Sequence, residues 1–236
     1  MSKLIYIGLL TFLVFTGGII QAQEVAAIKN ENYHNVEVTL NFGNEAFVPT
    51  LSYQYAFALG RNGNFIIGPG LRLFGISSNN SWRFAETNAP EDNFNDGDKN
   101  VNAFIADQTR IFGTSLGLYL AYRINKFEIG MNTDVIGFTI SNSVSGNYED
   151  INTGNRISVN NIKSERLILF PINGSYITEI FWAGYRFTHK SMLKLGITFA
   201  DFKYNVPNEE VSGINIPEEK FERIFTTFTI GYSIKL

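Results

Sequence analysis

Alternation of apolar residues with polar or small ones is the feature that most constrains this chain. The segment SLGLYLAYRINKFEIGMNTDVIGF (115–138) shows it twice, on either side of Ile124–Lys126. Successive side chains of a β-strand point to opposite faces. Each half therefore predicts a strand with one oily face and one face that carries Arg123, Glu128 or Asp134. In a soluble sheet the oily face forms the core, whereas in a membrane barrel it meets lipid and the charges point inward.

The whole chain repeats this pattern. Eight alternating segments can be placed, at Val36–Phe42, Phe47–Leu59, Phe65–Gly75, Thr109–Arg123, Phe127–Thr139, Tyr176–Phe187, Met192–Phe202 and Glu222–Lys235. The composition agrees with strands, because 21 Phe and 11 Tyr accompany only 3 Met.

Short and long connections alternate between these segments. After a tight Gly43–Ala46 turn, the short ones are Gly60–Asn64, Ile124–Lys126 and Thr188–Ser191, and the long ones are Ile76–Gln108, Ile140–Ser175 and Lys203–Phe221. In an up-and-down barrel this order puts the short turns and both chain termini at one end. That is the layout of bacterial outer-membrane barrels, with short periplasmic turns and long outer loops. Most segments also have the roughly 9–11 residues that a tilted strand needs to cross a bilayer.

The pattern therefore predicts an all-β fold, an eight-stranded antiparallel up-and-down transmembrane β-barrel located in the outer membrane. Aromatic residues near the strand ends would form girdles at the two membrane interfaces. They are Tyr53, Tyr55, Phe57, Tyr122, Phe127, Tyr185 and Phe187. The alternative interpretation is an exported soluble barrel with an aromatic core.

The amino terminus has the pattern of a secretory signal peptide. Lys3 precedes an apolar run that reaches about Ile20, and small Ala22 offers a cleavage site. We expect residues 1–22 to be the signal peptide and residues 23–236 to form the barrel domain; a retained membrane anchor is the alternative. The chain has no cysteine, which excludes disulfides and a lipoprotein anchor. Its net charge of −3, with scattered Lys and Arg, indicates no nucleic-acid partner.

Parity along the strands places several charges inside the predicted barrel. They are Glu37, Arg72, Glu128, Asp134 and Lys194. An eight-stranded barrel is just wide enough for its own side chains, so these charges must pair with one another or with trapped water. Arg72 and Asp134 each lie seven residues beyond the start of their segments, which predicts that they meet at one height. Two interpretations remain: a packed polar plug, or a path for protons or solutes.

No residue is assigned a catalytic, cofactor-binding or metal-binding role, and no cofactor is expected. His189-Lys190-Ser191 resembles the His-x-Ser pair of lipid A deacylases, but it falls in a short turn, and His34 has no evident partner. The acidic stretch 91–98 has the glycine of a calcium loop but lacks the oxygen ligand at the third position and the Glu at the twelfth. The apolar Leu167–Pro171 (LILFP) would extend a neighbouring strand or fold over the barrel mouth.

The carboxyl-terminal run Thr229–Leu236 resembles the assembly signal of outer-membrane barrels, although it ends in Leu236 rather than an aromatic residue. With the strand pattern, it makes the chain similar to the small eight-stranded OmpA/OmpX-like barrels, in the style of Bacteroidota. The resemblance implies contact with outer-membrane lipid and lipopolysaccharide, and with the barrel assembly machinery through the last strand. It also allows a protein partner at the outer loops.

Three functions follow as hypotheses. The first is a non-enzymatic outer-membrane barrel with a packed polar interior, whose long loops serve adhesion, envelope integrity or contact with a larger assembly. The second is an outer-membrane lipid-modifying enzyme, which needs His, Ser and a carboxylate near the outer rim. The third is an exported soluble barrel that binds a small apolar ligand, which needs an apolar interior.

Overall fold

The computed structural model describes most of the chain beyond the predicted signal peptide. The described residues are 32–43, 46–60, 62–78, 81–86, 102–150, 153–164, 166–169, 176–206, 209–211, 214–216 and 219–236. Their regular elements are fifteen β-strands. These residues contain no helix that is long and apolar enough to span a membrane. The predicted signal peptide, residues 1–22, lies outside the described residues.

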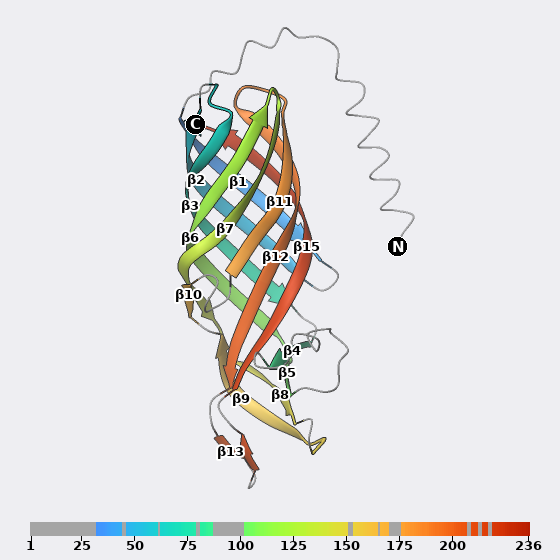
Figure 1. The fold of residues 1–236 in the computed structure, drawn as a ribbon. Helices are drawn as coiled ribbons and strands as arrows, with labels where there is room; N and C mark the ends of the chain where they lie inside the picture. The colour runs from blue at the N-terminus through green and yellow to red at the C-terminus, as the bar shows by residue number, and fades with distance from the viewer. Residues whose placement is uncertain are drawn as a thin grey trace, which may run out of the picture.

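Eight long strands pair in a closed circuit (Figure 1). They are β1 (Tyr33–Phe42), β2 (Phe47–Leu59), β3 (Phe65–Ser78), β6 (Thr109–Ile124), β7 (Phe127–Ser141), β11 (Tyr176–Arg186), β12 (Ser191–Val206) and β15 (Glu219–Lys235). Each pairs antiparallel with the next, and β15 returns to β1. Each of the eight predicted segments overlaps one of these strands, and six of the strands are longer than predicted. Because the circuit closes, its strands are paired on both sides, and the sheet has no long free edge.

Four shorter strands continue the sheet at the end away from the carboxyl terminus (Figure 1). They are β4 (Trp82–Glu86), β5 (Ala103–Ala106), β8 (Val144–Glu149) and β9 (Arg156–Ser164). β15 pairs with β4, the four strands pair in the order β4, β5, β8, β9, and β9 returns to β12. A second closed circuit therefore shares the β12–β15 pair with the first. We call these four strands, with residues 200–206 of β12 and residues 219–225 of β15, the extension.

The extension corrects the prediction that eight strands account for the sheet. Twelve strands lie in the two circuits, and the four additional strands come from the segments 76–108 and 140–175, which were predicted to be long loops. The seventh connection also contains strands, since β13 (Glu209–Val211) pairs with β14 (Ile214–Ile216). Three of the added strands have six residues or fewer, and β5 pairs only with segments distant in sequence, so their alternation alone was too weak to identify them.

The LILFP segment takes the first of its two predicted forms. β10 (Leu167–Leu169) pairs with β7 through Ile136–Phe138, beyond the point where β11 stops pairing with β7. Ile168 is fully buried. This part of the segment therefore extends the sheet, while Phe170 and Pro171 lie outside the described residues.

One apolar core joins the extension to the adjoining end of the first circuit. Val48, Phe74, Ile111 and Ile177 of the long strands belong to the same buried cluster as the aromatic residues of the extension. Those aromatic residues are Trp82, Phe84, Phe104, Tyr148, Phe202, Tyr204, Phe221 and Phe225. Their rings touch in succession, for example Trp82 with Phe225 at 4.5 Å and Phe84 with Tyr204 at 4.9 Å between centroids. The extension therefore closes that end of the barrel with packed side chains.

Replacing Phe84 with Ala is expected to loosen the extension. The ring is fully buried, and removing a buried Phe side chain costs about 3–5 kcal/mol. The measurement is limited proteolysis of the refolded protein in detergent, with the cut sites mapped by mass spectrometry. New cuts should appear within β4, β5, β8 and β9. The control is Phe47→Ala, because Phe47 is 43% exposed and its loss opens no interior cavity. Equal susceptibility of the two variants would contradict the packed extension.

Candidate functional site

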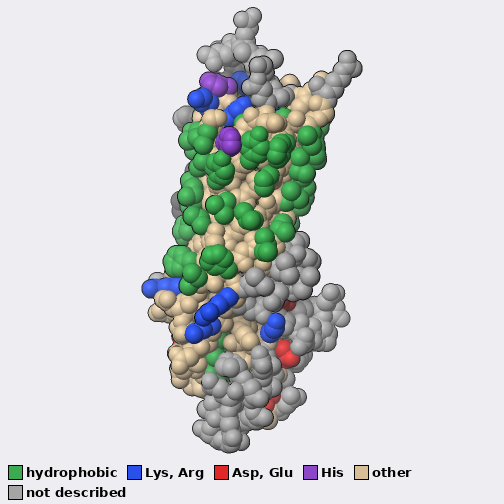
Figure 2. All heavy atoms as spheres, turned by 90° about the vertical axis from the view of Figure 1, so that its left-hand side faces the viewer, with side chains coloured by type: hydrophobic (Ala, Val, Ile, Leu, Met, Phe, Trp, Pro, Cys, Tyr) green, Lys and Arg blue, Asp and Glu red, His purple; other side chains and the backbone are tan. Residues whose placement is uncertain are grey.

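The outer surface of the first circuit carries an apolar belt (Figure 2). Its large exposed hydrophobic residues lie on the eight long strands or at their ends, and they include Val38, Leu40, Leu51, Leu71, Leu73, Phe112, Leu116, Ile129, Phe138, Ile140, Ile197, Phe228, Ile230 and Ile234. Among described residues, β4, β5, β8 and β9 contribute none of them. A continuous apolar surface of this extent is not stable in water and marks contact with lipid.

The predicted girdle residues mostly face outward. Tyr53, Phe57, Tyr122, Phe127 and Phe187 are between 37% and 61% exposed. The remaining two, Tyr55 and Tyr185, are half-buried. The belt ends at the extension, where β8 and β9 expose mainly polar side chains such as Ser145, Arg156 and Ser158. The apolar surface therefore has the limited height that a bilayer requires.

The first ionic group lies inside the barrel near the short turns, which we call the short-turn end. Glu128 accepts hydrogen bonds from Arg123 at 3.0 Å and from Arg186 at 3.2 Å, and the Tyr119 hydroxyl donates to its other oxygen at 2.6 Å. Both arginines also donate to the hydroxyl of Tyr33, at 3.0 and 3.2 Å. The Glu128 carboxylate is fully buried, and two cations compensate its charge.

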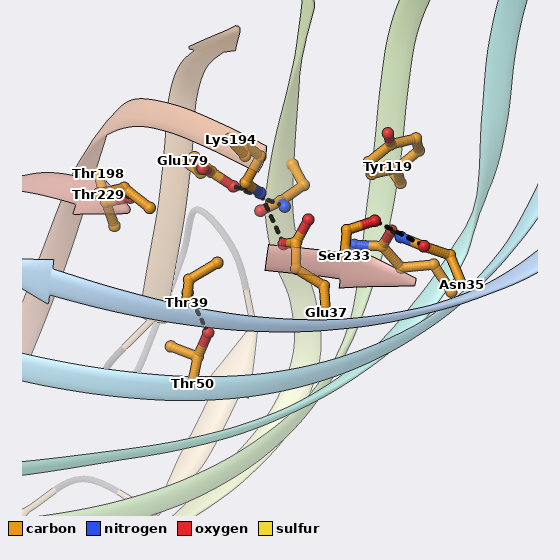
Figure 3. A network of polar contacts seen from close by, with 12 residues as sticks. Asn35, Glu37, Thr39, Thr50, Tyr119, Glu179, Lys194, Thr198, Thr229 and Ser233 are labelled. Carbon is orange, nitrogen blue, oxygen red and sulfur yellow. Dashed lines mark hydrogen bonds and ion pairs between the residues drawn. The ribbon is translucent and has the colours of Figure 1, made fainter. Parts of the chain in front are cut away.

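The second ionic group centres on Lys194 (Figure 3). Its Nζ lies 2.6 Å from Glu37 Oε1 and 2.7 Å from Glu179 Oε2. The indole ring of Trp182 lies 5.0 Å from the same ammonium. Lys194 is fully buried. One cation therefore holds two carboxylates, one from the adjacent strand β11 and one from β1, which lies on the other side of β15.

The third ionic group centres on Arg72. Its Nη1 donates to Asp134 at 2.9 Å and to the carbonyl oxygen of Ile177 at 2.9 Å, and its Nη2 donates to Asn132. Asn132 in turn donates to Glu179 at 2.8 Å. The amide oxygen and nitrogen of Asn132 thus connect the second and third groups into one network.

The interior charges cancel. Glu37, Glu128, Asp134 and Glu179 are balanced by Arg72, Arg123, Arg186 and Lys194, and all eight residues are buried. Mutual pairing is what allows charges to remain in a space shielded from water. The layer next to the ions, toward the extension, contains hydroxyl pairs such as Thr39 with Thr50 at 2.5 Å and Thr198 with Thr229 at 2.6 Å.

Little space is left between these side chains. A cavity of about 20 Å³ lies beside Arg72 and Asp134, and one of about 10 Å³ lies between Glu37 and Glu179. A cavity needs roughly 10–15 Å³ to hold one water molecule. These cavities fit single waters, and neither is large enough for a small apolar ligand.

The alternation rule placed the interior charges correctly. Glu37, Arg72, Glu128, Asp134 and Lys194 are all buried, between 0% and 8% exposed. The predicted pairing of Arg72 with Asp134 is confirmed. The sequence pattern also placed Arg123 on the charged face, but Arg123 was left out of the list of interior charges, and Arg186 was not assigned to the interior although it has inward parity on its strand.

Glu179 was missed for a different reason. By parity with Tyr185 and Phe187 it would face lipid, but β11 contains a bulge at Ile180 relative to both β7 and β12. Ile180 and Phe181 are both exposed, and Glu179 and Trp182 are both buried. The extra residue shifts the alternation by one position. In the sequence, two apolar residues in a row, Ile180 and Phe181, interrupt the alternation, and this interruption is the signal that could have indicated the bulge.

Neither histidine lies in a catalytic arrangement within the described residues. His189 is exposed in its turn, and Ser191 instead accepts a hydrogen bond from Tyr232 at 3.2 Å. His34 lies inside β1 rather than before it, with its Nδ1 2.5 Å from the Tyr53 hydroxyl. At Gly68 of β3 a Cβ would clash with the Tyr55 carbonyl oxygen, so the strands approach too closely there for any side chain.

The calcium hypothesis has no geometry to support it. Residues 91–98 lie outside the described residues. In the part of the chain that is described, no three His, Asp or Glu side chains are grouped as metal ligands.

A closed sheet with a lipid-facing belt and a charged, paired interior defines a class of protein, the transmembrane β-barrel. The chain is a barrel of the outer-membrane type, and the outer membrane is its location.

Several solved structures of outer-membrane proteins resemble the chain at low identity. The attachment invasion locus protein Ail of Yersinia pestis is 10% identical over 87% of this chain and 99% of that chain, with a TM-score of 0.35. A major outer membrane protein of Thermus thermophilus is 14% identical over 87% and 99%, with a TM-score of 0.39. OprG of Pseudomonas aeruginosa is 10% identical over 88% and 97%, with a TM-score of 0.40. These scores are low, so the class rests on the belt and the circuit. No protein-family model and no curated protein matches the sequence.

Replacing Arg72 with Ala is expected to destabilise the barrel by about 3–5 kcal/mol, because it leaves the buried Asp134 carboxylate without its cation. Adding Asp134→Asn removes that lone charge and should recover part of the loss. A double-mutant cycle on urea unfolding in detergent measures the coupling. Strict additivity of the two single changes would mean that the residues do not interact.

Deleting Ile180 is expected to leave the barrel able to fold. Glu179 and Phe181 pair with consecutive residues of β12, so the deletion removes only the extra residue, restores strict alternation and keeps Glu179 and Trp182 on the inner face. The contrasting variant deletes Ala183, which lies in a regularly alternating stretch; its loss turns the residues on one side of it to the wrong face and should prevent folding. Folding is followed by the faster migration of the unheated protein on detergent gels. Loss of folding in the Ile180 deletion, or normal folding in the Ala183 deletion, would contradict this register.

Proposed function

We propose that this chain is a non-enzymatic, eight-stranded, up-and-down barrel that spans the outer membrane and carries the extension on the outside. The observation that carries the proposal is the combination of a neutralised ionic interior with an apolar belt limited to the eight long strands. In this proposal residues 1–22 direct export, and the last strand engages the barrel assembly machinery.

Three features support a sealed interior over a conducting one. The ionic groups join strands that are not neighbours in the circuit, β1 with β12, β3 with β7 and β1 with β11, through direct contacts of 2.6–3.2 Å. The cavity beside Arg72 and the one between Glu37 and Glu179 fit only single waters. Beyond them, the apolar core shared with the extension fills the mouth. An ion entering this space would have to displace paired charges or packed aromatic rings.

The extension supports a role in contact rather than catalysis. Its strands are held by a packed aromatic core and by ring closure through β12 and β15, so it presents its connections on a rigid support. Rigid supports with variable connections are the usual arrangement for binding surfaces. Adhesion, envelope integrity and contact with a larger assembly are the functions that this arrangement serves.

The two alternative functions receive less support. A lipid-modifying enzyme needs a nucleophile and base at the outer rim, and both histidines lie at the short-turn end (Figure 2). A soluble carrier needs a ligand cavity, and the barrel interior is filled by ion pairs.

The sealed interior predicts that the purified protein shows no steady ion conductance in planar bilayers. Insertion is checked independently, by recovering the bilayer-reconstituted protein and testing whether it still migrates faster unheated than boiled. A general-diffusion porin measured in the same bilayers is the positive control. Large and stable conductance from correctly inserted wild-type protein would replace the sealed barrel with a pore.

A further inference from the structure

Exposed cations lie just beyond the belt at the end that carries the extension. They are Arg110 of β6, Lys163 of β9 and Arg166, which precedes β10, and all three side chains are exposed. Within the described residues, no ion pair joins any of them to a carboxylate. Figure 2 shows Lys and Arg side chains gathered directly below the hydrophobic belt.

Strand register places Arg110 beside the margin of the belt. It lies two residues from Phe112 and therefore emerges on the same outward face of β6. Phe112 pairs in register with Ile140 on β7. These two apolar side chains are 64% and 65% exposed, more than most others in the belt.

The other two cations converge on the same place. The carbonyl oxygen of Arg166 accepts a hydrogen bond from the Thr139 amide at 2.7 Å. The amide of Ser164, which follows Lys163, donates to the Ser141 hydroxyl at 3.0 Å. Both cations are thus anchored to the last residues of β7, the strand that pairs with β6.

The local charge is in excess of what the neighbouring residues neutralise. Asp107 is an exposed carboxylate three residues from Arg110, and it forms no ion pair among the described residues. The sequence adds one more carboxylate, Glu165, which precedes Arg166 and lies outside the described residues. Three cations against these two carboxylates leave a net positive charge. Guanidinium groups match the geometry of phosphate oxygens, and a lysine adds a point charge.

We propose that this surface, Arg110, Lys163 and Arg166 together with Phe112, Phe138 and Ile140, binds a phosphate-bearing anionic lipid of the outer leaflet. The cations hold the phosphates, and the acyl chains lie on the three apolar side chains. The charged surface is continuous with the belt, so it suits a lipid with an anionic head group. A soluble anion would contact the cations but not the apolar side chains. The inference rests on the proposed orientation, in which the extension faces outward.

The test compares lipid binding by the full chain refolded in detergent micelles. The probes are bisphosphorylated lipid A and the same lipid after removal of its phosphates, and bound lipid is counted by native mass spectrometry. Each cation near an anionic surface contributes roughly fivefold in affinity. The wild type should prefer the phosphorylated lipid by at least about tenfold, and Arg110→Gln/Lys163→Gln/Arg166→Gln should lose most of that preference.

A matched control makes the same change in net charge elsewhere. Lys126→Gln/Arg156→Gln/Lys190→Gln alters two cations at the short-turn end and one on the extension that already pairs with Glu149 at 3.0 Å. This control should keep the preference, which should also weaken in high salt.

Three results would overturn the inference: equal affinity of the wild type for both lipids, an unchanged preference in the first triple variant, or an equal loss in the control. Binding of soluble heparin that depends on the same three cations, without a lipid preference, would assign the surface to a glycan instead. Failure of the wild type to insert into liposomes would contradict the proposed function. Normal insertion without a lipid preference contradicts this inference alone.

Discussion

Mutual neutralisation of the buried charges is the constraint on which the rest of the barrel depends. Removing two ions from water costs several kcal/mol each. Their mutual attraction offsets this cost only if they pair closely and their remaining donors and acceptors are satisfied. Lys194 meets this condition by binding Glu37 and Glu179 at once, and Asn132 links Glu179 to Arg72. Because the polar residues of every long strand are engaged inside, the alternate residues can all be apolar. Pairing of the inward polar side chains therefore goes together with an apolar belt on the outer surface.

The interior changes character along the barrel axis. Ion pairs and a small apolar cluster around Trp182 and Met192 occupy the part near the short-turn end, hydroxyl pairs follow, and a larger apolar core continues into the extension. The aromatic core is therefore not a separate domain packed on a barrel, since Phe74 and Ile177 of the long strands share it with Trp82 and Tyr204. This change along the axis explains how one end of the barrel can be closed without charges. The closed end is where the first circuit adjoins the second.

The alternation of side chains predicted the long strands and the sidedness of most interior charges, because both follow from a period of two. It failed where the period is interrupted. At Ile180 one extra residue turns Glu179 inward, and at Val135 a second bulge leaves Val135 and Ile136 both exposed. It also failed in the extension, where β5 has only four residues and its partners lie far away in sequence. Such short strands are specified by the packing of Trp82 and Phe84, which no local pattern reveals.

The last strand belongs to both circuits, as does its hairpin partner β12. β15 pairs with β1 to close the first circuit, with β4 to close the second, and with β12 along the whole hairpin from Ile234 to Glu219. Without it, neither circuit can close, and both the ionic interior and the aromatic core would be open to solvent or lipid. The pairs formed by β2 to β12 therefore stabilise the barrel fully only once β1 contacts β15. These two strands are distant in sequence, and bringing them together carries a large entropic cost. Folding of the barrel and of the extension should accordingly be one cooperative event, governed by the placement of β15.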